Sequence, residues 1–139
     1  MMCDICMYFS PLEAYHYRQW CIRIVIEEGE WFENEGTFVL YFDVAFEGRL
    51  LGRVDIVTKL AVSQDGLTLH AYQTDMHGLT RNQLGLSGIK AIAQAVMEDS
   101  NVDQLVVEAN YRTTGANPRH TPRPYTFRRE HGAVRKGDD

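Results

Sequence analysis

The sequence has little cysteine, no long apolar run and no basic leader. Three cysteines are too few and too irregularly spaced for a disulfide scaffold, so we expect a reducing compartment. The longest apolar stretches, such as residues 38–46, are short and interrupted by charge, which argues against a membrane span. Residues 1–9 are apolar but lack a small-residue cleavage site, so we expect no conventional signal peptide. The protein is therefore expected to be cytoplasmic when it is made.

Cysteine and histidine near the amino-terminus allow one metal hypothesis. Cys3 and Cys6 form a Cys-x-x-Cys pair, and His16 with Cys21 could complete a tetrahedral zinc site. Structural zinc sites usually show two clear ligand pairs, and the second pair here is loosely spaced. Free thiols at an apolar amino-terminus explain the residues more simply, so we expect no metal.

The length and the turn signals predict one domain, residues 1–139, built around an antiparallel meander. A hydrophobic content of 45% is enough for a single core. Residues 20–74 alternate in polarity and are rich in β-branched and aromatic types, with turn signals at Glu47-Gly48 and Asp65-Gly66. This pattern predicts four consecutive antiparallel strands.

Helical periodicity follows the meander. Apolar residues recur at helical spacing through residues 81–99, which predicts an amphipathic helix. Ser10 and Pro11 predict a short helix over residues 11–20, and residues 102–109 and 125–129 read as strands. The predicted fold class is therefore α+β: an antiparallel four-strand meander plus carboxy-terminal strands, with one face covered by a long amphipathic helix. We expect residues 132–139 to be a disordered tail.

The charge of the chain is unevenly distributed. Residues 110–139 hold 7 of the 14 lysines and arginines and 3 of the 19 acids, a net of +4. Residues 1–109 carry a net of −9, which gives −5 for the whole chain. An acidic body with a basic end is expected where a local patch meets phosphate. A solvated, charged terminal strand would give the same composition.

The basic end contains a turn-rich segment with the side chains that phosphate chemistry needs. Arginine can grip a phosphate through two hydrogen bonds, and hydroxyl groups can position a nucleic-acid backbone. The candidate catalytic residues are Arg112, Arg119, His120 and Tyr125. The candidate nucleic-acid-binding residues are Thr113, Thr114, Asn117, Thr121, Arg123 and Arg128.

His120 is the histidine of this segment that suits acid or base chemistry near neutral pH. Metal-independent RNA cleavage needs a base for the 2′-hydroxyl proton, an acid for the leaving 5′-oxygen and cations for the phosphorane. The second proton-transfer group stays open among Tyr125, His70, His77 and a carboxylate. An exposed loop histidine and a solvated strand face would explain the same residues without function.

Residues 107–127, with the run Arg-Thr-Thr-Gly-Ala-Asn-Pro at 112–118, resemble the carboxy-terminal toxin modules of bacterial polymorphic toxins. These modules form the variable ends of rearrangement-hotspot and contact-dependent inhibition proteins. The resemblance implies a nuclease that is neutralised by a cognate immunity protein, and the residues of the segment favour RNA cleavage without a metal ion or cofactor. It also implies export and delivery to a target cell.

A competing enzyme hypothesis comes from residues 81–90. They are similar to the pyrophosphate-binding turn of GNAT-type acetyltransferases, which binds coenzyme A at a helix amino-terminus. The spacing departs from that family's pattern, because Gly85 follows Arg81 by four residues and position 87 is serine. Glycines that allow a helix to pack closely against a sheet explain the run equally well.

A third hypothesis is a non-catalytic protein of the immunity or inhibitor type. The glutamates of residues 27–35 flank Trp31 and Phe32, and aromatic anchors rimmed by charge suit a protein interface. A solvated hairpin loop would also explain them. The acidic residues concerned are Glu27, Glu28, Glu30, Glu33 and Glu35.

Overall fold

The computed structural model describes residues 14–79, 81–109 and 124–136. Within these ranges the chain forms eight strands and one helix. They are β1 (Ala14–Tyr17), β2 (Trp20–Gly29), β3 (Glu35–Phe46), β4 (Arg49–Val62), β5 (Thr68–Gly78), α2 (Arg81–Ser100), β6 (Gln104–Ala109), β7 (Tyr125–Arg128) and β8 (Val134–Lys136). Strands make up 60% of the described residues and helix 18%, so the described fold is mostly β.

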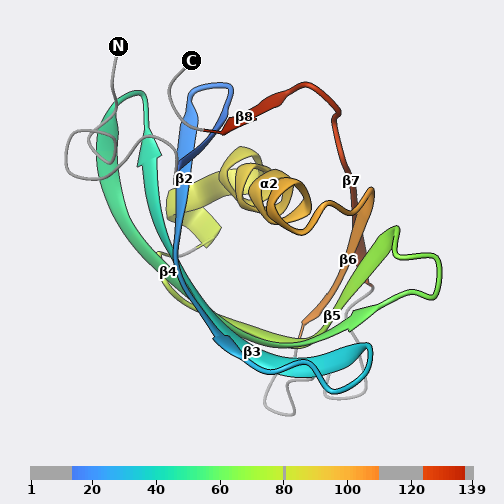
Figure 1. Ribbon diagram of the computed structural model, residues 1–139. Coiled ribbons are helices and arrows are strands. Elements are labelled where there is room, and N and C mark those ends of the chain that lie inside the picture. Colours follow the sequence, from blue (N-terminus) through green and yellow to red (C-terminus); the bar gives the residue numbers. More distant parts are fainter. Residues whose placement is uncertain (1–13, 80, 110–123, 137–139) are drawn as a thin grey trace.

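The eight strands form one mixed sheet in the order β7-β6-β5-β4-β3-β2-β1-β8. β1 to β5 are successive antiparallel neighbours, and α2 connects β5 to a parallel β6. β7 and β8 add antiparallel strands at the two edges. The sheet curls into a half-barrel, and α2 lies inside the curve (Figure 1).

The predicted α+β class is wrong. The predicted meander corresponds to β2 to β5, which are only the middle of the larger sheet. β2 is the one strand of that meander among the close neighbours of α2, and the others are β1, β6, β7 and β8, so the helix does not cover the meander as predicted. Curvature explains the difference. Register shifts interrupt the β2/β3, β3/β4 and β4/β5 pairs, and bulges of this kind bend and twist strands so that the sheet wraps around the helix.

Two local predictions are also corrected. The part of the predicted 11–20 helix that the structure describes is instead β1 and its turn into β2; residues 11–13 lie outside the described residues. Tyr15 and Tyr17 bury their rings on the same side of β1, which favours strand pairing over helix. Val134 is buried opposite Tyr17, so residues 134–136 of the predicted 132–139 tail form β8, and residues 137–139 lie outside the described residues.

The core lies between α2 and the inner face of the sheet. Phe42, Val44 and Val54 are fully buried on β3 and β4. The helix faces them with small residues among its larger ones, and its buried side chains include Ala91, Ala93, Ala95 and Met97. Small side chains let the sheet approach the helix closely, as expected for a densely packed interior.

A short connection draws the two edges of the sheet together. β7 and β8 lie at opposite edges, yet only residues 129–133 separate them in the chain. We call residues 129–133 the C-terminal strap. It passes across α2 between the two edges (Figure 1), so the helix is enclosed on the side that the sheet leaves open.

Candidate functional site

Most of the predicted site residues fall in residues 110–123, outside the described residues. The residues concerned are Arg112, Thr113, Thr114, Asn117, Arg119, His120, Thr121 and Arg123. Tyr125 and Arg128 can be placed, and both lie on β7. The geometry of the candidate site is therefore built from β7 and the strands beside it.

The structure does not bring Tyr125 and Arg128 together. Tyr125 lies on the inner side of β7 with the buried Phe127, and their ring centroids are 4.6 Å apart. Arg128 is exposed and lies on the outer side with Thr126, because successive side chains of a strand alternate between faces. Tyr125 remains 51% exposed.

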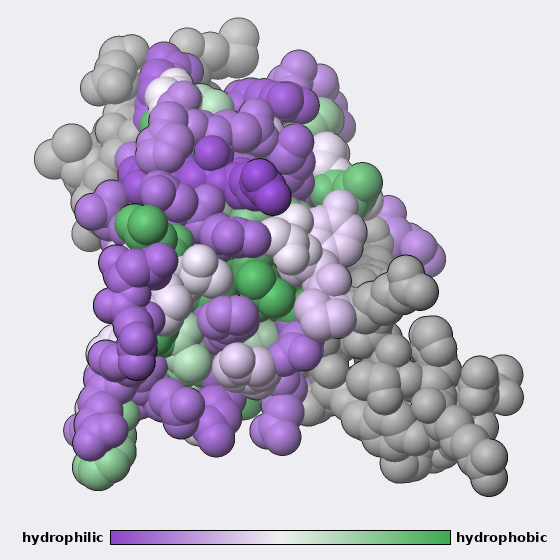
Figure 2. Space-filling model, turned by 90° about the vertical axis from the view of Figure 1, so that its right-hand side faces the viewer, coloured by the Kyte–Doolittle hydropathy of each residue, from purple (hydrophilic) through white to green (hydrophobic). Residues whose placement is uncertain are grey.

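The outer face of β5 to β7 carries a second set of functional groups. His70 and Tyr72 stack in parallel on β5, with ring centroids 5.6 Å apart and planes 8° apart. Val106 of β6 separates His70 from Thr126 in register, so the two lie roughly 10 Å apart across two strand spacings. We call His70, Tyr72, Glu108, Thr126 and Arg128 the outer patch. Figure 2 views the molecule from this side, where hydrophilic residues predominate and apolar residues form small islands.

The outer patch borders the segment that holds the predicted catalytic residues. β6 ends at Ala109 and β7 begins at Tyr125, and the last register pair of the two strands joins Val107 to Tyr125. Both ends of residues 110–123 therefore start from the same edge of the sheet, next to Glu108. His70 and His77, two of the open options for a second proton-transfer group, both lie on the outer face of β5. His70 lies beside Val106 within this patch, and His77 lies opposite Asp55, beyond the Thr74 that pairs with the last residue of β6.

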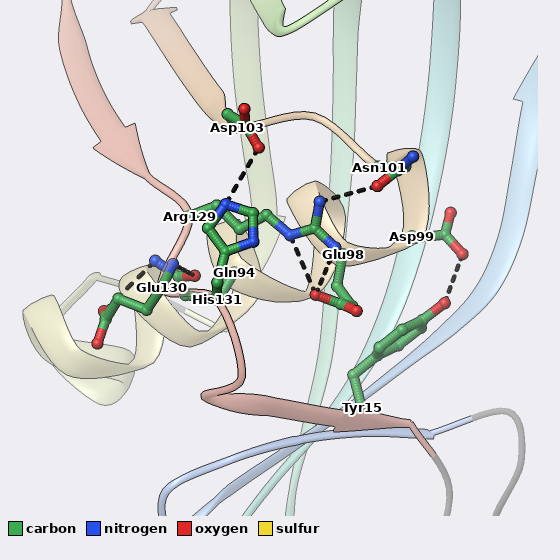
Figure 3. Close-up of polar contacts among 9 residues, drawn as sticks. All are labelled: Tyr15, Gln94, Glu98, Asp99, Asn101, Asp103, Arg129, Glu130 and His131. Carbon is green, nitrogen blue, oxygen red and sulfur yellow. Dashed lines mark hydrogen bonds and ion pairs between the residues drawn. The ribbon is translucent and has the colours of Figure 1, made fainter.

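Arg129, the arginine after β7, is held in a structural network. Its guanidinium group donates to Glu98 Oε2 from Nε at 3.1 Å and from Nη2 at 2.9 Å. It also donates to Asn101 Oδ1 at 2.9 Å (Figure 3). The side chain is only 12% exposed, so its charge is neutralised against α2 and is not available to a ligand.

Gln94 fixes the backbone of the strap. Its amide nitrogen donates to the Arg128 carbonyl at 2.8 Å, and its amide oxygen accepts from the Glu130 backbone N–H at 3.0 Å. The Gln94 side chain is fully buried. One polar residue on the helix therefore satisfies two backbone groups of the strap, which an apolar side chain could not do.

Glu130 links the strap to the β1–β2 hairpin. Its carboxylate accepts from the Tyr17 hydroxyl at 2.5 Å and pairs with Lys90 at 3.1 Å and with Arg18 at 3.6 Å. The hydrogen bond from Tyr17 and the pairing with Lys90 lower the pKa of Glu130 below its usual value, against a smaller effect of burial. The contacts of Arg129 with α2 and of Glu130 with the β1–β2 hairpin thus hold the first two residues of the strap in place.

A bulge in β2 turns Glu27 toward the inner face. The register with β3 shifts between Ile24 and Ile26, so that Glu27 lies opposite the buried Leu40. Directly opposed residues of antiparallel strands share a face. The sequence pattern alone does not reveal this shift.

The inward-facing Glu27 forms a hydrogen bond with Asp99 at the end of α2. The Tyr15 hydroxyl donates to the same Asp99 carboxylate at 2.7 Å (Figure 3). Burial, followed by the hydrogen bond and the charge of Asp99, raises the pKa of Glu27 to about 7. Burial and the bond to Asp99 also raise the pKa of Tyr15 well above its usual 10. Glu27 can therefore hold a proton near neutral pH.

The Glu27–Asp99 pair is expected to make stability depend on pH between about 4.5 and 7. Glu27 titrates near 4.5 in an unfolded chain, so the folded state binds its proton more tightly. Stability is then greatest below this window and falls as the pH rises through it. The loss should be about 1 kcal/mol or less, because Glu27 is more than one-third exposed and water screens the pair. Urea unfolding at several pH values measures it.

Two variants test the assignment to Glu27. Glu27→Gln should remove this part of the pH dependence, because the amide does not titrate. Glu28→Gln is the matched control, since Glu28 lies opposite Val39 on the outer face and should leave the dependence intact. An unchanged slope in Glu27→Gln would show that another group is responsible.

No metal centre is formed by the described residues, where no group of three or more His, Cys, Asp or Glu side chains could hold an ion. His16 and Cys21 of the zinc hypothesis do lie directly opposite each other across β1 and β2. Cys3 and Cys6 lie outside the described residues. Among the parts of the chain that the structure describes, no helix is both long and apolar enough to cross a membrane.

Comparison with known proteins gives no family assignment. No family profile matches this sequence, and no curated protein matches it significantly. The function must therefore be argued from the site.

Proposed function

We propose that this protein cleaves RNA without a metal ion, in the manner of a polymorphic-toxin nuclease. The observation that carries the proposal is the position of the outer patch beside both ends of residues 110–123. This arrangement sets an imidazole, a guanidinium group and a hydroxyl on the outer face of β5 to β7, beside the strand ends from which the Arg- and His-bearing segment departs. A segment whose two ends are held by paired strands loses less entropy when it orders around a ligand.

His120 and His70 are the proposed proton-transfer pair. One imidazole takes the proton of the 2′-hydroxyl, whose oxygen attacks the phosphorus, and the other protonates the departing 5′-oxygen. The products are a 2′,3′-cyclic phosphate and a free 5′-hydroxyl. Arg128, with Arg112 and Arg119, supplies cations for the extra charge on the phosphorane. Glu108 is the carboxylate placed to orient or deprotonate an imidazole on this face.

The test is cleavage of a labelled single-stranded RNA by the full-length chain in the presence of a chelator. We expect products with 2′,3′-cyclic phosphate ends. His120→Ala and His70→Ala should each reduce the rate by roughly 10²-fold to 10⁴-fold, the usual contribution of a positioned acid or base. His131→Ala is the matched control, since His131 is an exposed histidine of the strap that pairs with Asp103, at the opposite end of β6 from residues 110–123.

Two outcomes would contradict the proposal. Full activity in both His120→Ala and His70→Ala would remove these residues from the mechanism. Absence of cleavage together with tight coenzyme A binding would favour the acetyltransferase alternative. One observation supports that alternative: α2 joins the parallel β5 and β6, and its helical geometry is broken at Gly85, which has φ +66°. Such a break begins a new helical segment, and the amino-terminus of a helix is a favourable place for a phosphate.

The proposal includes a protein partner. A cell that makes an RNA-cleaving enzyme in its cytoplasm needs an inhibitor until the enzyme is exported. We therefore propose a cognate immunity protein, with delivery to a target cell as the route to the substrate. A small acidic reading frame beside the gene would support this part of the proposal.

A further inference from the structure

The β2–β3 connection is an ordered hairpin that projects an aromatic side chain. Phe32 and Glu35 form a bridge in which the Phe32 N–H donates to the Glu35 carbonyl at 2.6 Å and the Glu35 N–H donates back at 3.2 Å. Glu33 takes a positive φ of 58° between them. We call residues 28–35 the hairpin tip. Its backbone is fixed by its own hydrogen bonds.

The two aromatic residues of the hairpin tip have different roles. Trp31 packs against Phe38 of β3 with ring centroids 4.8 Å apart, which braces the tip. Phe32 is 81% exposed, the highest exposed fraction among the large apolar side chains that the structure describes. A single exposed apolar residue is common, but a rigidly held phenylalanine beside a half-exposed tryptophan is typical of an interface anchor.

Among the described residues, the charged side chains that flank Phe32 along the chain are all acidic. Glu28, Glu30, Glu33 and Glu35 are exposed, and the sequence has no lysine or arginine from residue 24 to residue 48. Glu27 does not add to this surface, because the bulge in β2 turns it toward Asp99. Lys59 of β4 lies opposite Thr37, beyond the tip. The hairpin tip therefore presents one exposed apolar side chain, Phe32, flanked by carboxylates.

We propose that the hairpin tip is a docking site for a protein surface in which lysine and arginine side chains surround an apolar pocket. Phe32 fills the pocket, and the glutamates meet the cations at its rim. Burial of an aromatic anchor supplies the affinity, whereas opposite charges speed association and fix orientation. The carboxylates repel phosphate, which excludes RNA from the tip. The inference does not rest on the proposed RNA cleavage.

The test uses the full chain as bait for a library of random peptides displayed on phage. We expect the enriched peptides to combine lysine or arginine with an aromatic or aliphatic residue. A synthetic copy of the leading peptide should bind Phe32→Ser about 10-fold to 30-fold more weakly than it binds the wild type, as for an interface hot spot. Glu30→Lys should also weaken peptide binding, and the loss of affinity should be larger at low salt than at high salt.

Leu67→Ser is the matched control, since Leu67 is a 48% exposed apolar residue in the β4–β5 turn. It should leave peptide binding unchanged. The proposal is overturned if no peptide depends on Phe32, or if the enriched peptides carry no positive charge. It is also overturned if Phe32→Ser abolishes self-association of the protein or its binding to RNA, because the occupant would then be a second copy or a nucleic acid. RNA cleavage by Phe32→Ser should equal that of the wild type.

Discussion

Gln94→Ala is expected to lower the free energy of unfolding by about 2 to 4 kcal/mol. The substitution removes the hydrogen-bonding partners of the Arg128 carbonyl and the Glu130 N–H, both of which lie against the helix. Each buried group left unpaired costs about 1 to 3 kcal/mol, and the fully buried side chain also leaves a cavity. Urea unfolding followed by tryptophan fluorescence gives the loss.

The strap offers a local measurement of the same effect. Hydrogen exchange at the Glu130 amide should become much faster in Gln94→Ala than the fall in global stability explains, since the strap separates first from α2. Asn82→Ala is the control, because Asn82 is an exposed amide near the start of the same helix. A loss below about 0.5 kcal/mol would mean that water replaces the glutamine amide without penalty.

Gly78→Ala is expected to destabilise the fold by about 3 to 5 kcal/mol, through two effects that act together. Gly78 has φ +94°, a conformation that L-residues rarely adopt. A β-carbon at this position would also overlap the backbone carbonyl of Arg53 on β4. Since backbone cannot swing aside as a side chain can, the last pair of the β4–β5 ladder must separate.

Gly66→Ala distinguishes the two effects. Gly66 has φ +74°, but a β-carbon there would meet no atom within 4 Å. This variant should therefore lose only the conformational part, about 1 kcal/mol. Thermal unfolding of both variants gives the difference. Equal losses would mean that the overlap with Arg53 is relieved by a small shift of the strands.

The turns and the helix could be predicted from the sequence because their signals are local. Glu47 and Gly48 both take positive φ values in the β3–β4 turn, as a short turn between twisted strands requires. Asp65 accepts hydrogen bonds from Ser63 and from the Leu67 N–H in the next turn. The range of α2 follows from the helical recurrence of apolar residues.

The curvature of the sheet and the strap could not be predicted in this way. The bulge before Glu27 leaves no trace in the hydrophobic pattern, since an apolar residue occupies every position from 24 to 26. β8 is three residues long, and it depends on Val134 meeting Tyr17 from the other end of the chain. Gln94 is visible as a polar residue between alanines, but its partners lie more than thirty positions away.

The candidate site was partly predictable. Strand alternation alone shows that the side chains of Tyr125 and Arg128 face opposite ways. The prediction of one site that contains both residues therefore conflicts with the alternation of β7. The same rule places His70 and Tyr72 on one polar face. The sequence does not show which strands lie side by side, and only the parallel pairing of β5 with β6 brings His70 toward β7.

The pairing of β1 with β8 has a consequence for the edge of the sheet. Tyr15 lies opposite Lys136, so the first and last described strands run side by side at one corner of the molecule. Arg23 of β2 pairs with Ala14 at this corner, and the chain then runs six residues to Gly29, about 20 Å along the strand. Truncation of β8 would therefore expose the backbone edge of β1 to pairing with another strand, at a corner about 20 Å from the hairpin tip.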